Sequence, residues 1–160
     1  DKAIVELMDS TGLRVSEVIN LKLSDINLAD RCLTCNDTNK QRIVPFSEKA
    51  KKWLERYLDE SREILVKKKE TGMLFVNCHG TPMSRQGLWK IIKYYAQMAD
   101  IDKDITPHML RHSFAAHMAE CGTDLKDIQK ILGHSDITTT QIYRDITETS
   151  HKEGFLLNEK

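Results

Sequence analysis

Two short β-like runs interrupt a chain that otherwise has the apolar spacing of helices, and this pattern constrains the fold more than any other feature. The runs cover Ile26–Cys35 and Arg42–Phe46, and the polar stretch Asn36–Asn39 lies between them. Such a stretch between two β-like runs is typical of a hairpin turn, and Pro45 restricts the second run to a sheet edge or a strand end. The sequence therefore predicts a mainly α fold with a small antiparallel β-sheet or hairpin.

Helical patterns flank the predicted hairpin on both sides. Residues 2–10 and 14–21 carry apolar side chains at helical spacing, and Thr11-Gly12 separates them. Four further helices are each preceded by a residue suited to cap a helix N-terminus: Ser47, Ser84, Thr106 and Asp124. We expect these helices to end near residues 58, 98, 121 and 132. We also expect an exposed charged segment at 61–72, a short strand at 73–76, a short helix at 139–144 and an amphipathic piece at 146–157.

Length and composition fit one domain. The chain has 160 residues, of which 40% are hydrophobic, and this is enough for a single core. No apolar run approaches the roughly 18 residues of a membrane span, so we expect no membrane partner. Because the chain starts at Asp1 inside a helical pattern, we expect residues 1–160 to be a single domain excised from a longer protein.

The charges balance overall but are unevenly distributed. The formal net charge is zero, which taken alone argues against binding nucleic acid by bulk electrostatics. Residues 40–93, however, contain 13 basic and six acidic residues, a net of +7, so the rest of the chain carries −7. This segment could form a positive face for phosphate groups. It could equally be a solvated lysine-rich helix and a basic turn.

The four cysteines raise the question of a metal site. Cys32 and Cys35 have the spacing of a zinc knuckle, and His79 follows Cys78, but no second pair completes a tetrahedral set. In a strand, moreover, residues three apart point to opposite faces. We therefore expect no metal, and the scattered thiols favour a reducing cytoplasm.

His108 and Arg111 lie three residues apart at the start of the helix predicted after Thr106-Pro107, so they share one face of that helix. The free backbone N–H groups of a first turn favour an anion. A histidine and an arginine at this place suit a phosphate or a carboxylate, although an exposed histidine beside a surface arginine is the commoner origin of an H-x-x-R pattern. We expect His112, further along, to pack or to support the others.

Two further clusters contain candidate functional residues. His134 follows the helix that ends at Gly133, and Tyr143 comes nine residues later. A core or interface tyrosine is the alternative there. Arg14 lies where one predicted helix gives way to the next, and Glu17 could pair with it at i, i+3.

Together these clusters resemble the tyrosine recombinase family, which includes phage integrases and Xer-type recombinases. The matching stretches are TGLRVSEVINLKLSDI, NKQRIVPF, TPHMLRHSFAAH and LGHSDITTTQIY, and the resemblance extends from Ala3 to about Thr147. It implies the tyrosine recombinase catalytic fold, that of a DNA breaking-rejoining enzyme. The catalytic residues that it implies are Arg14, His108, Arg111, His134 and the nucleophile Tyr143.

The resemblance implies site-specific DNA recombination or integration with no metal and no other cofactor. Two arginines would stabilise the charge that builds up on a DNA phosphodiester in the transition state. A phenol has a pKa of about 10 and needs a base; His108 would help remove its proton, and His134 would hydrogen-bond the phosphate. Attack by Tyr143 would form a 3′-phosphotyrosyl intermediate and release a 5′-hydroxyl, and this covalent bond would conserve the energy for rejoining.

The predicted hairpin departs from the family pattern. Members of the family usually carry a lysine in the hairpin turn that protonates the leaving 5′-oxygen, but alignment on Asn39–Arg42 puts Asp37 at that position. Loss of a general acid typically lowers the rate about 10²–10⁴-fold. Lys40 is the candidate replacement, and the alternative is that Lys40 only contacts the DNA backbone.

The resemblance also implies partners. Double-stranded DNA would lie against the hairpin and the helix that follows Ser84. The candidate DNA contacts are Arg42, Arg85, Gln86 and Lys90. The tail 147–160 is expected to dock on a neighbouring protomer of a homo-tetramer, or else on its own domain. The resemblance implies that residues 1–160 are the C-terminal part of a longer protein, and the family's N-terminal core-binding domain is absent from them, so this domain alone should bind DNA weakly.

Two other functions are compatible with the sequence. One is a type IB topoisomerase-like enzyme, although the compact LGHS-x-x-x-T-T-x-x-Y run favours the recombinase. The other is a DNA-binding module of the same fold with impaired catalysis, which Asp37 motivates.

Overall fold

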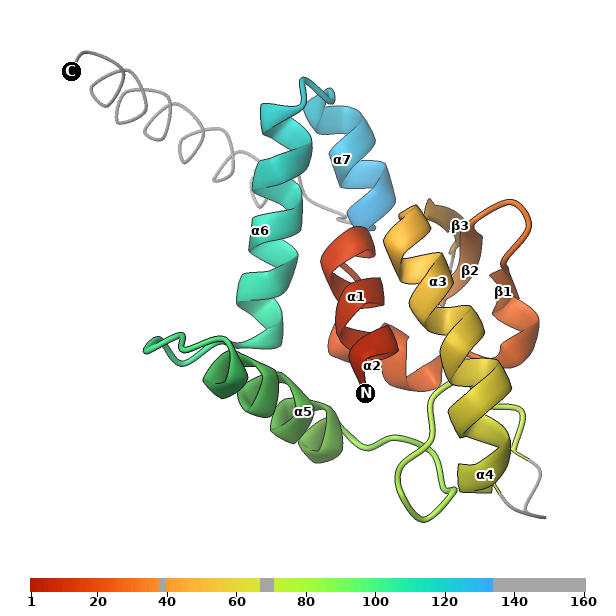
Figure 1. Ribbon diagram of the computed structural model, residues 1–160. Helices are drawn as coiled ribbons and strands as arrows, with labels where there is room; N and C mark the ends of the chain where they lie inside the picture. The colour runs from red at the N-terminus through yellow and green to blue at the C-terminus, as the bar shows by residue number, and fades with distance from the viewer. Residues whose placement is uncertain (38–39, 67–70, 134–160) are drawn as a thin grey trace.

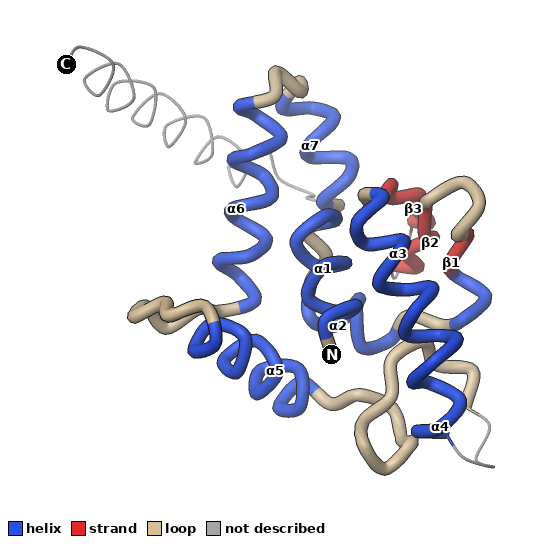
Figure 2. Tube along the Cα trace, in the orientation of Figure 1, coloured by secondary structure: helices blue, strands red, loops and turns tan. Residues whose placement is uncertain are grey.

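Helices make up most of the computed structural model, which describes residues 1–37, 40–66 and 71–133 (Figure 1). The elements in chain order are α1 (Lys2–Thr11), α2 (Val15–Asn20), η1 (Leu23–Asp25), β1 (Ile26–Asn27), β2 (Cys32–Asp37), β3 (Lys40–Pro45), α3 (Glu48–Arg56), η2 (Tyr57–Arg62), α4 (Glu63–Val66), α5 (Arg85–Met98), α6 (Pro107–Glu120) and α7 (Leu125–Leu132). The predicted class, mainly α with a small antiparallel sheet, is confirmed (Figure 2). The elements predicted at 139–144 and 146–157 lie outside the described residues. Within the described ranges, no helix combines the length and the apolar character needed to cross a bilayer.

All four predicted N-caps accept a hydrogen bond from the first turn of their helix. The N–H groups of Ala50, Gly87, Met109 and Lys126 donate to the side chains of Ser47, Ser84, Thr106 and Asp124 at 3.1, 3.0, 3.2 and 3.2 Å. These bonds satisfy N–H groups that have no partner inside the helix. The local sequence thus determines where α3, α5, α6 and α7 begin, and α7 ends before Gly133 as predicted.

The sheet has three antiparallel strands in the order β1-β2-β3, so the prediction of one continuous run over Ile26–Cys35 is wrong. Residues 28–31 form a turn that divides this run into β1 and β2. The Asp30 N–H donates to the side-chain oxygen of Asn27 at 3.0 Å, a bond that favours a turn. Arg31 completes the turn with a φ of +52°.

The β2–β3 ladder is the hairpin that the sequence predicts, and its last described pair sets Asp37 opposite Lys40. Because side chains alternate between the faces of a strand, Arg42 and Val44 share one face of β3 and Ile43 lies on the other. Val44 is fully buried, whereas Ile43 is 69% exposed. The Arg42 side chain therefore lies on the inner face of the sheet.

Residues 73–76 form no strand, contrary to the prediction. Its end residues Met73 and Val76 form only isolated bridges, and the Leu74 N–H donates to the Leu21 carbonyl at 2.7 Å. The Tyr57 hydroxyl donates to the Leu74 carbonyl and accepts from the Val76 N–H, both at 3.1 Å. Because these partners come from separate places, no continuous ladder forms, and this apolar segment enters the core without extending the sheet.

The Arg62 side chain likewise bonds the main chain of this segment. Its guanidinium donates to three carbonyls between Thr71 and Leu74 at 2.6–3.2 Å. Arg62 is half-buried by these contacts, and Val66 is buried. The prediction that residues 61–72 are exposed throughout is therefore wrong.

The described residues form two hydrophobic clusters. The larger cluster joins α1, α2, the sheet, α3, η2 and α5, and it contains the fully buried Leu7, Leu54 and Leu88. The smaller cluster belongs to α6 and α7 and consists of Phe114, Ala115, Ile128 and Leu132. Helix α1 lies between α3 and α6 (Figure 1). The two clusters meet near Gly12 at the end of α1, where Phe114 and Leu132 of the smaller cluster lie.

Candidate active site

Arg14 lies in the short connection between α1 and α2. Gly12 ends α1 with a φ of +61°, and Arg14 stands at the N-cap position of α2. The Arg14 backbone N–H donates to Glu17 Oε2 at 2.7 Å, and Arg14 Nη1 lies 3.4 Å from Glu17 Oε1. The predicted pairing of Arg14 with Glu17 is confirmed, and it limits where the arginine side chain can point.

Arg111 is a buried arginine that connects three helices. It projects from α6 and is 5% exposed. Its Nη1 donates to the Gly12 carbonyl at 2.6 Å, and its Nη2 donates to the Leu132 carbonyl at 2.7 Å. Bonds to two nitrogens fix the plane of the guanidinium, and they tie α6 to the ends of α1 and α7.

Three arginines from separate elements meet at the C-terminal end of α7. Arg42 Nε, Arg111 Nη2 and Arg14 Nη2 donate to the consecutive carbonyls of Ile131, Leu132 and Gly133, at 2.9, 2.7 and 3.1 Å. The last carbonyls of a helix have no partner within it and form the negative end of its dipole. We call Arg14, Arg42 and Arg111 the arginine cluster. It brings together the two arginines, Arg14 and Arg111, that the sequence predicts to bind phosphate.

His108 lies exposed in the first turn of α6 and contacts a second histidine. Its Nε2 is 2.7 Å from Nε2 of His112, and the two rings meet edge to face. One nitrogen must donate and the other accept, so the pair holds one proton at this contact. Burial lowers the pKa of His112, and the positive charges of His108 and Arg111 lower it further. The i, i+4 spacing of the two histidines could have indicated this pair.

The other predicted catalytic groups lie at the edge of the described structure or beyond it. His134 comes directly after Gly133, but His134 and Tyr143 are outside the described residues. The backbone of Lys40 begins β3, and the side chains of residues 37–40 are likewise outside the description. The roles of His134, Tyr143 and Lys40 stay predictions.

Three of the predicted DNA contacts project from the exposed side of α5. Arg85, Gln86 and Lys90 are all exposed, and they lie in the first two turns of this helix. Exposure gives a duplex access to these side chains. Their contact with DNA stays a prediction.

The fourth predicted DNA contact, Arg42, points inward. Its side chain is 12% exposed, and its Nη2 lies 2.6 Å from Glu17 Oε1. This contact was not predicted from the sequence. The apolar Val44 two residues further on gives the one signal for it, because residues at i and i+2 share a face of a strand.

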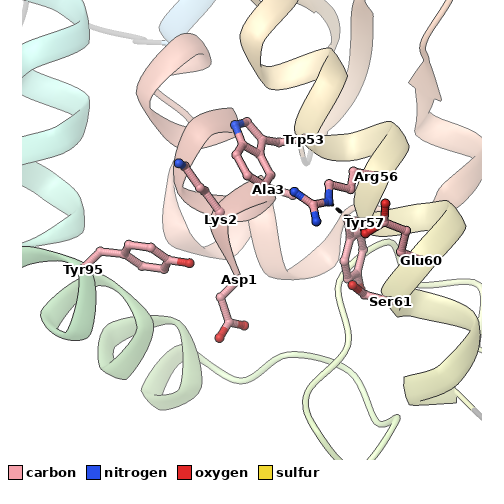
Figure 3. A pocket seen from close by; sticks show the side chains of 9 residues that line it. All are labelled: Asp1, Lys2, Ala3, Trp53, Arg56, Tyr57, Glu60, Ser61 and Tyr95. Atoms are coloured by element: carbon pink, nitrogen blue, oxygen red, sulfur yellow. Dashed lines mark hydrogen bonds and ion pairs between the residues drawn. The ribbon is translucent and has the colours of Figure 1, made fainter. Parts of the chain in front are cut away.

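Two of the cavities in the described part of the structure differ in their distance from these residues. One of about 430 Å³ lies between α2 and β2 and includes Glu17 in its wall, so it adjoins the arginine cluster. The other, of about 290 Å³, lies between the start of α1, α3 and α5; Trp53, Arg56 and Tyr95 line it, and none of the predicted catalytic residues does (Figure 3). Among the described residues, no three His, Cys, Asp or Glu side chains gather in an arrangement that could hold a metal ion.

Comparison with known sequences gives extensive matches. Residues 1–150 match the sequence model of the Phage integrase family. Tyrosine recombinase XerD of Halalkalibacterium halodurans is 49% identical over 156 residues, which cover 97% of this chain and 52% of the relative. The chain therefore spans about half the length of the curated relatives that it matches.

Solved structures share the arrangement of helices around the small sheet. XerA recombinase has a TM-score of 0.85 at 34% identity, and the match covers 99% of this chain and 56% of the XerA chain. XerH site-specific recombinase, in a post-cleavage complex with a palindromic difH substrate, has a TM-score of 0.79 at 26% identity and covers 99% of this chain and 46% of its own. The fold predicted from the sequence motifs is thus the one seen in recombinases.

Proposed function

The chain belongs to the phage integrase family, and on this premise we propose that it is the catalytic domain of a site-specific DNA recombinase or integrase. It cleaves and rejoins DNA through a 3′-phosphotyrosyl intermediate without using a metal. The observation that carries the proposal is the arginine cluster, in which Arg14 and Arg111 bond adjacent carbonyls just before His134. The XerH relative is seen bound to its difH substrate, which supports double-stranded DNA as the partner.

In this proposal Arg14 and Arg111 bind the non-bridging oxygens of the scissile phosphate. Guanidinium groups match the geometry of a phosphate and stabilise the negative charge of the transition state. Their bonds to the Gly133 and Leu132 carbonyls hold both groups in place before DNA arrives. Little reorganisation is then needed during the reaction, which is the main source of electrostatic catalysis.

Tyr143 is the proposed nucleophile. Its phenolic oxygen attacks phosphorus, the bond from phosphorus to the 5′-oxygen breaks, and a 3′-phosphotyrosyl link forms. His108 accepts the phenolic proton, and His134 hydrogen-bonds the phosphate. The leaving 5′-oxygen takes a proton from Lys40, or from water if Lys40 only contacts the backbone of the DNA. Attack by a 5′-hydroxyl on the phosphotyrosine reverses these steps and rejoins the strand.

A suicide substrate tests the proposal, because a nick beside the cleavage site lets the short 5′-hydroxyl strand diffuse away and traps the covalent complex. We expect a protein–DNA adduct that survives SDS. The same chain with Tyr143→Phe should bind the DNA equally well and give no adduct. Tight binding without an adduct in the parent chain would instead indicate a DNA-binding module, and relaxation of supercoiled DNA without a recombination site would favour a topoisomerase.

The same assay addresses Lys40. We expect Lys40→Ala to slow cleavage about 10²–10⁴-fold if Lys40 is the general acid, and a 5′-thiolate leaving group, which needs no acid, should restore the rate. Equal rates for Lys40→Ala and the parent on unmodified DNA would eliminate this role.

Two further parts of the proposal concern assembly and location. The tail 147–160 docks on a neighbouring protomer of a homo-tetramer on DNA, and light scattering of a chain truncated after Ser150 would detect the loss of assembly. The four cysteines have no framework spacing, in keeping with a cytoplasmic location, which cell fractionation would check.

A further inference from the structure

We propose that Arg42 is a positioning residue for strand cleavage: it holds Glu17, and through Glu17 the Arg14 guanidinium, at the end of α7. The inference rests on the proposed function, because Arg14 is one of the two arginines that bind the scissile phosphate there. Arg42 acts from behind the phosphate site and makes no DNA contact itself.

The place of Arg42 in the sheet separates it from the outer surface of the hairpin. Its side chain is 12% exposed, and Val44 on the same face of β3 is fully buried. α7 packs against β3. The opposite face carries Ile43, which is 69% exposed. A duplex lying on the hairpin would therefore meet the face of Ile43, and Arg42 would lie behind it.

Arg42 joins two other elements through one planar group. Its Nη2 donates to Glu17 Oε1 at 2.6 Å, and its Nε donates to the Ile131 carbonyl at 2.9 Å. Charge-assisted bonds of this kind are roughly twice as strong as neutral ones. Because the guanidinium is rigid, the two bonds fix α2 relative to the end of α7, and a lysine with its single ammonium cannot reproduce both.

Glu17 is the residue through which Arg42 acts on Arg14. Both arginines approach the same oxygen, Glu17 Oε1, at 2.6 Å from Arg42 and 3.4 Å from Arg14. The Glu17 side chain is 12% exposed, so solvent screens its charge poorly. With Arg42 present, the three groups carry a net charge of +1 next to the phosphate site. Without it, Glu17 would pair with Arg14 alone and cancel the charge that Arg14 offers to a phosphate.

The residue that ends α7 leaves room for Arg42. A Cβ atom on Gly133 would lie 2.7 Å from Nη1 and 2.9 Å from Cζ of Arg42, closer than atoms in contact can be. Gly133 also has a φ of +64°, which disfavours other residues. The Arg42 guanidinium therefore packs directly on the residue that precedes His134, and it supports the end of α7 that both phosphate-binding arginines also contact.

Single-turnover cleavage of the suicide substrate by the Arg42→Gln variant tests the inference. We expect adduct formation to slow about 10–100-fold, because small displacements of a catalytic group have effects of this size. The salt slope of DNA binding should fall by at most about one phosphate contact, that of Arg14. Arg31→Gln is the matched control, because it removes another arginine of the sheet region from an exposed pair with Glu48 at 3.4 Å, and its cleavage rate should equal that of the parent.

A substrate with a neutral methylphosphonate at the scissile position distinguishes positioning from a merely structural role. This substrate lacks the negative charge that Arg14 stabilises, so loss of Arg14 should matter less. If Arg42 acts through Arg14, the loss caused by Arg42→Gln should shrink at least about fivefold, together with the loss caused by Arg14→Gln. An equal loss on both substrates would overturn the inference.

The Arg42→Lys variant covers the case in which Arg42→Gln does not fold. It keeps a positive charge beside Glu17 but loses the bond to Ile131, so we expect a smaller loss that again shrinks on the methylphosphonate. A folded Arg42→Lys variant whose loss does not shrink contradicts the role of Arg42. If the parent chain forms no adduct at all, the proposed function itself fails; if the parent cleaves and Arg42→Gln cleaves equally fast, only the inference about Arg42 fails.

Discussion

The larger hydrophobic cluster and the α6–α7 pair are stabilised in different ways. Within the described residues, 19 buried side chains form the larger cluster, whereas four form the smaller one. Burial of apolar area is the main source of stability, so the α6–α7 pair depends more on its boundary with α1. Two kinds of contact cross that boundary: Phe114 packs over Gly12, and arginines bond main-chain carbonyls.

The same boundary contains the candidate active site. Arg14 and Arg42 come from the part of the structure that contains the larger hydrophobic cluster, whereas His108 and Arg111 come from α6. Because the arginines bond carbonyls across the boundary, the groups proposed to bind phosphate also fix how the two parts pack. Stability and preorganisation therefore depend on the same bonds, so each variant must be tested for both.

The largest difference in stability should appear between variants of the two arginines that are proposed to bind phosphate. Arg111→Met leaves the carbonyls of Gly12 and Leu132 without a partner inside the protein, and we expect the free energy of unfolding to fall by about 3–5 kcal/mol. The Arg14 side chain is 40% exposed, so Arg14→Met should lower it by less than about 1 kcal/mol. Urea denaturation followed by circular dichroism measures both values.

Cleavage assays complete this prediction. Under the proposed function both variants lose adduct formation, although only Arg111→Met loses stability. Hydrogen exchange should show the destabilisation first in α6 and α7. Equal losses of stability in the two variants would contradict the view that the bonds of the buried Arg111 hold the α6–α7 pair against α1.

Packing at Gly12 should give the next largest effect. A Cβ atom there would collide with the Phe114 ring and lie 2.8 Å from a methyl carbon of Leu132, and its φ of +61° disfavours alanine. We expect Gly12→Ala to lower the free energy of unfolding by about 2–4 kcal/mol, from backbone strain and overpacking together. Thermal or urea unfolding measures this loss.

Gly122 provides the matched control for Gly12. It has a φ of +81°, and a Cβ atom there would have no neighbour within 4 Å. Gly122→Ala should therefore show the strain alone, about 1–2 kcal/mol. If the two substitutions cost the same, the packing of Phe114 against α1 does not hold the α6–α7 pair in place.

Local signals in the sequence predicted the parts of the fold that depend on neighbouring residues. The N-caps of α3, α5, α6 and α7 and the pairing of Arg14 with Glu17 are confirmed, because each involves residues two or three positions apart. The predicted strand at 73–76 is wrong because its backbone forms only isolated bridges and bonds the hydroxyl of Tyr57, which no local pattern indicates. The turn after Asn27 depends on one side-chain bond inside an otherwise β-like run.

The candidate site shows the same division. The catalytic set is taken from the resemblance, because the order and spacing of the motifs are properties of the sequence, and the roles of its members stay predictions. Val44 indicates the inward face of Arg42, but the bond of Arg42 to Ile131 could not be predicted, because the two residues lie 89 positions apart. Burial of Arg111 is another consequence of packing, since its acceptors belong to the ends of α1 and α7.

The smallest expected effect concerns the pH dependence of stability at the histidine pair. Burial lowers the pKa of His112, with further contributions from His108 and Arg111. Below the ordinary histidine pKa of about 6.5, His112 is protonated in the unfolded chain, whereas in the folded protein it stays neutral until the pH approaches the lowered pKa. The unfolded state then binds more protons, so the contribution of His112 to stability is complete above this pH and is lost as the pH falls toward the lowered pKa.

His112→Gln tests this prediction because glutamine does not titrate. We expect the free energy of unfolding of the parent to fall more steeply than that of the variant between about pH 7 and 5.5, where histidines titrate. His117→Gln removes an exposed histidine of the same helix, and its pH profile should follow that of the parent. The effect is small because the His112 ring is only half-buried. A second proton on the histidine pair would break the 2.7 Å contact between His112 and His108 and add positive charge beside Arg111. Identical slopes for parent and His112→Gln would contradict the lowered pKa of His112.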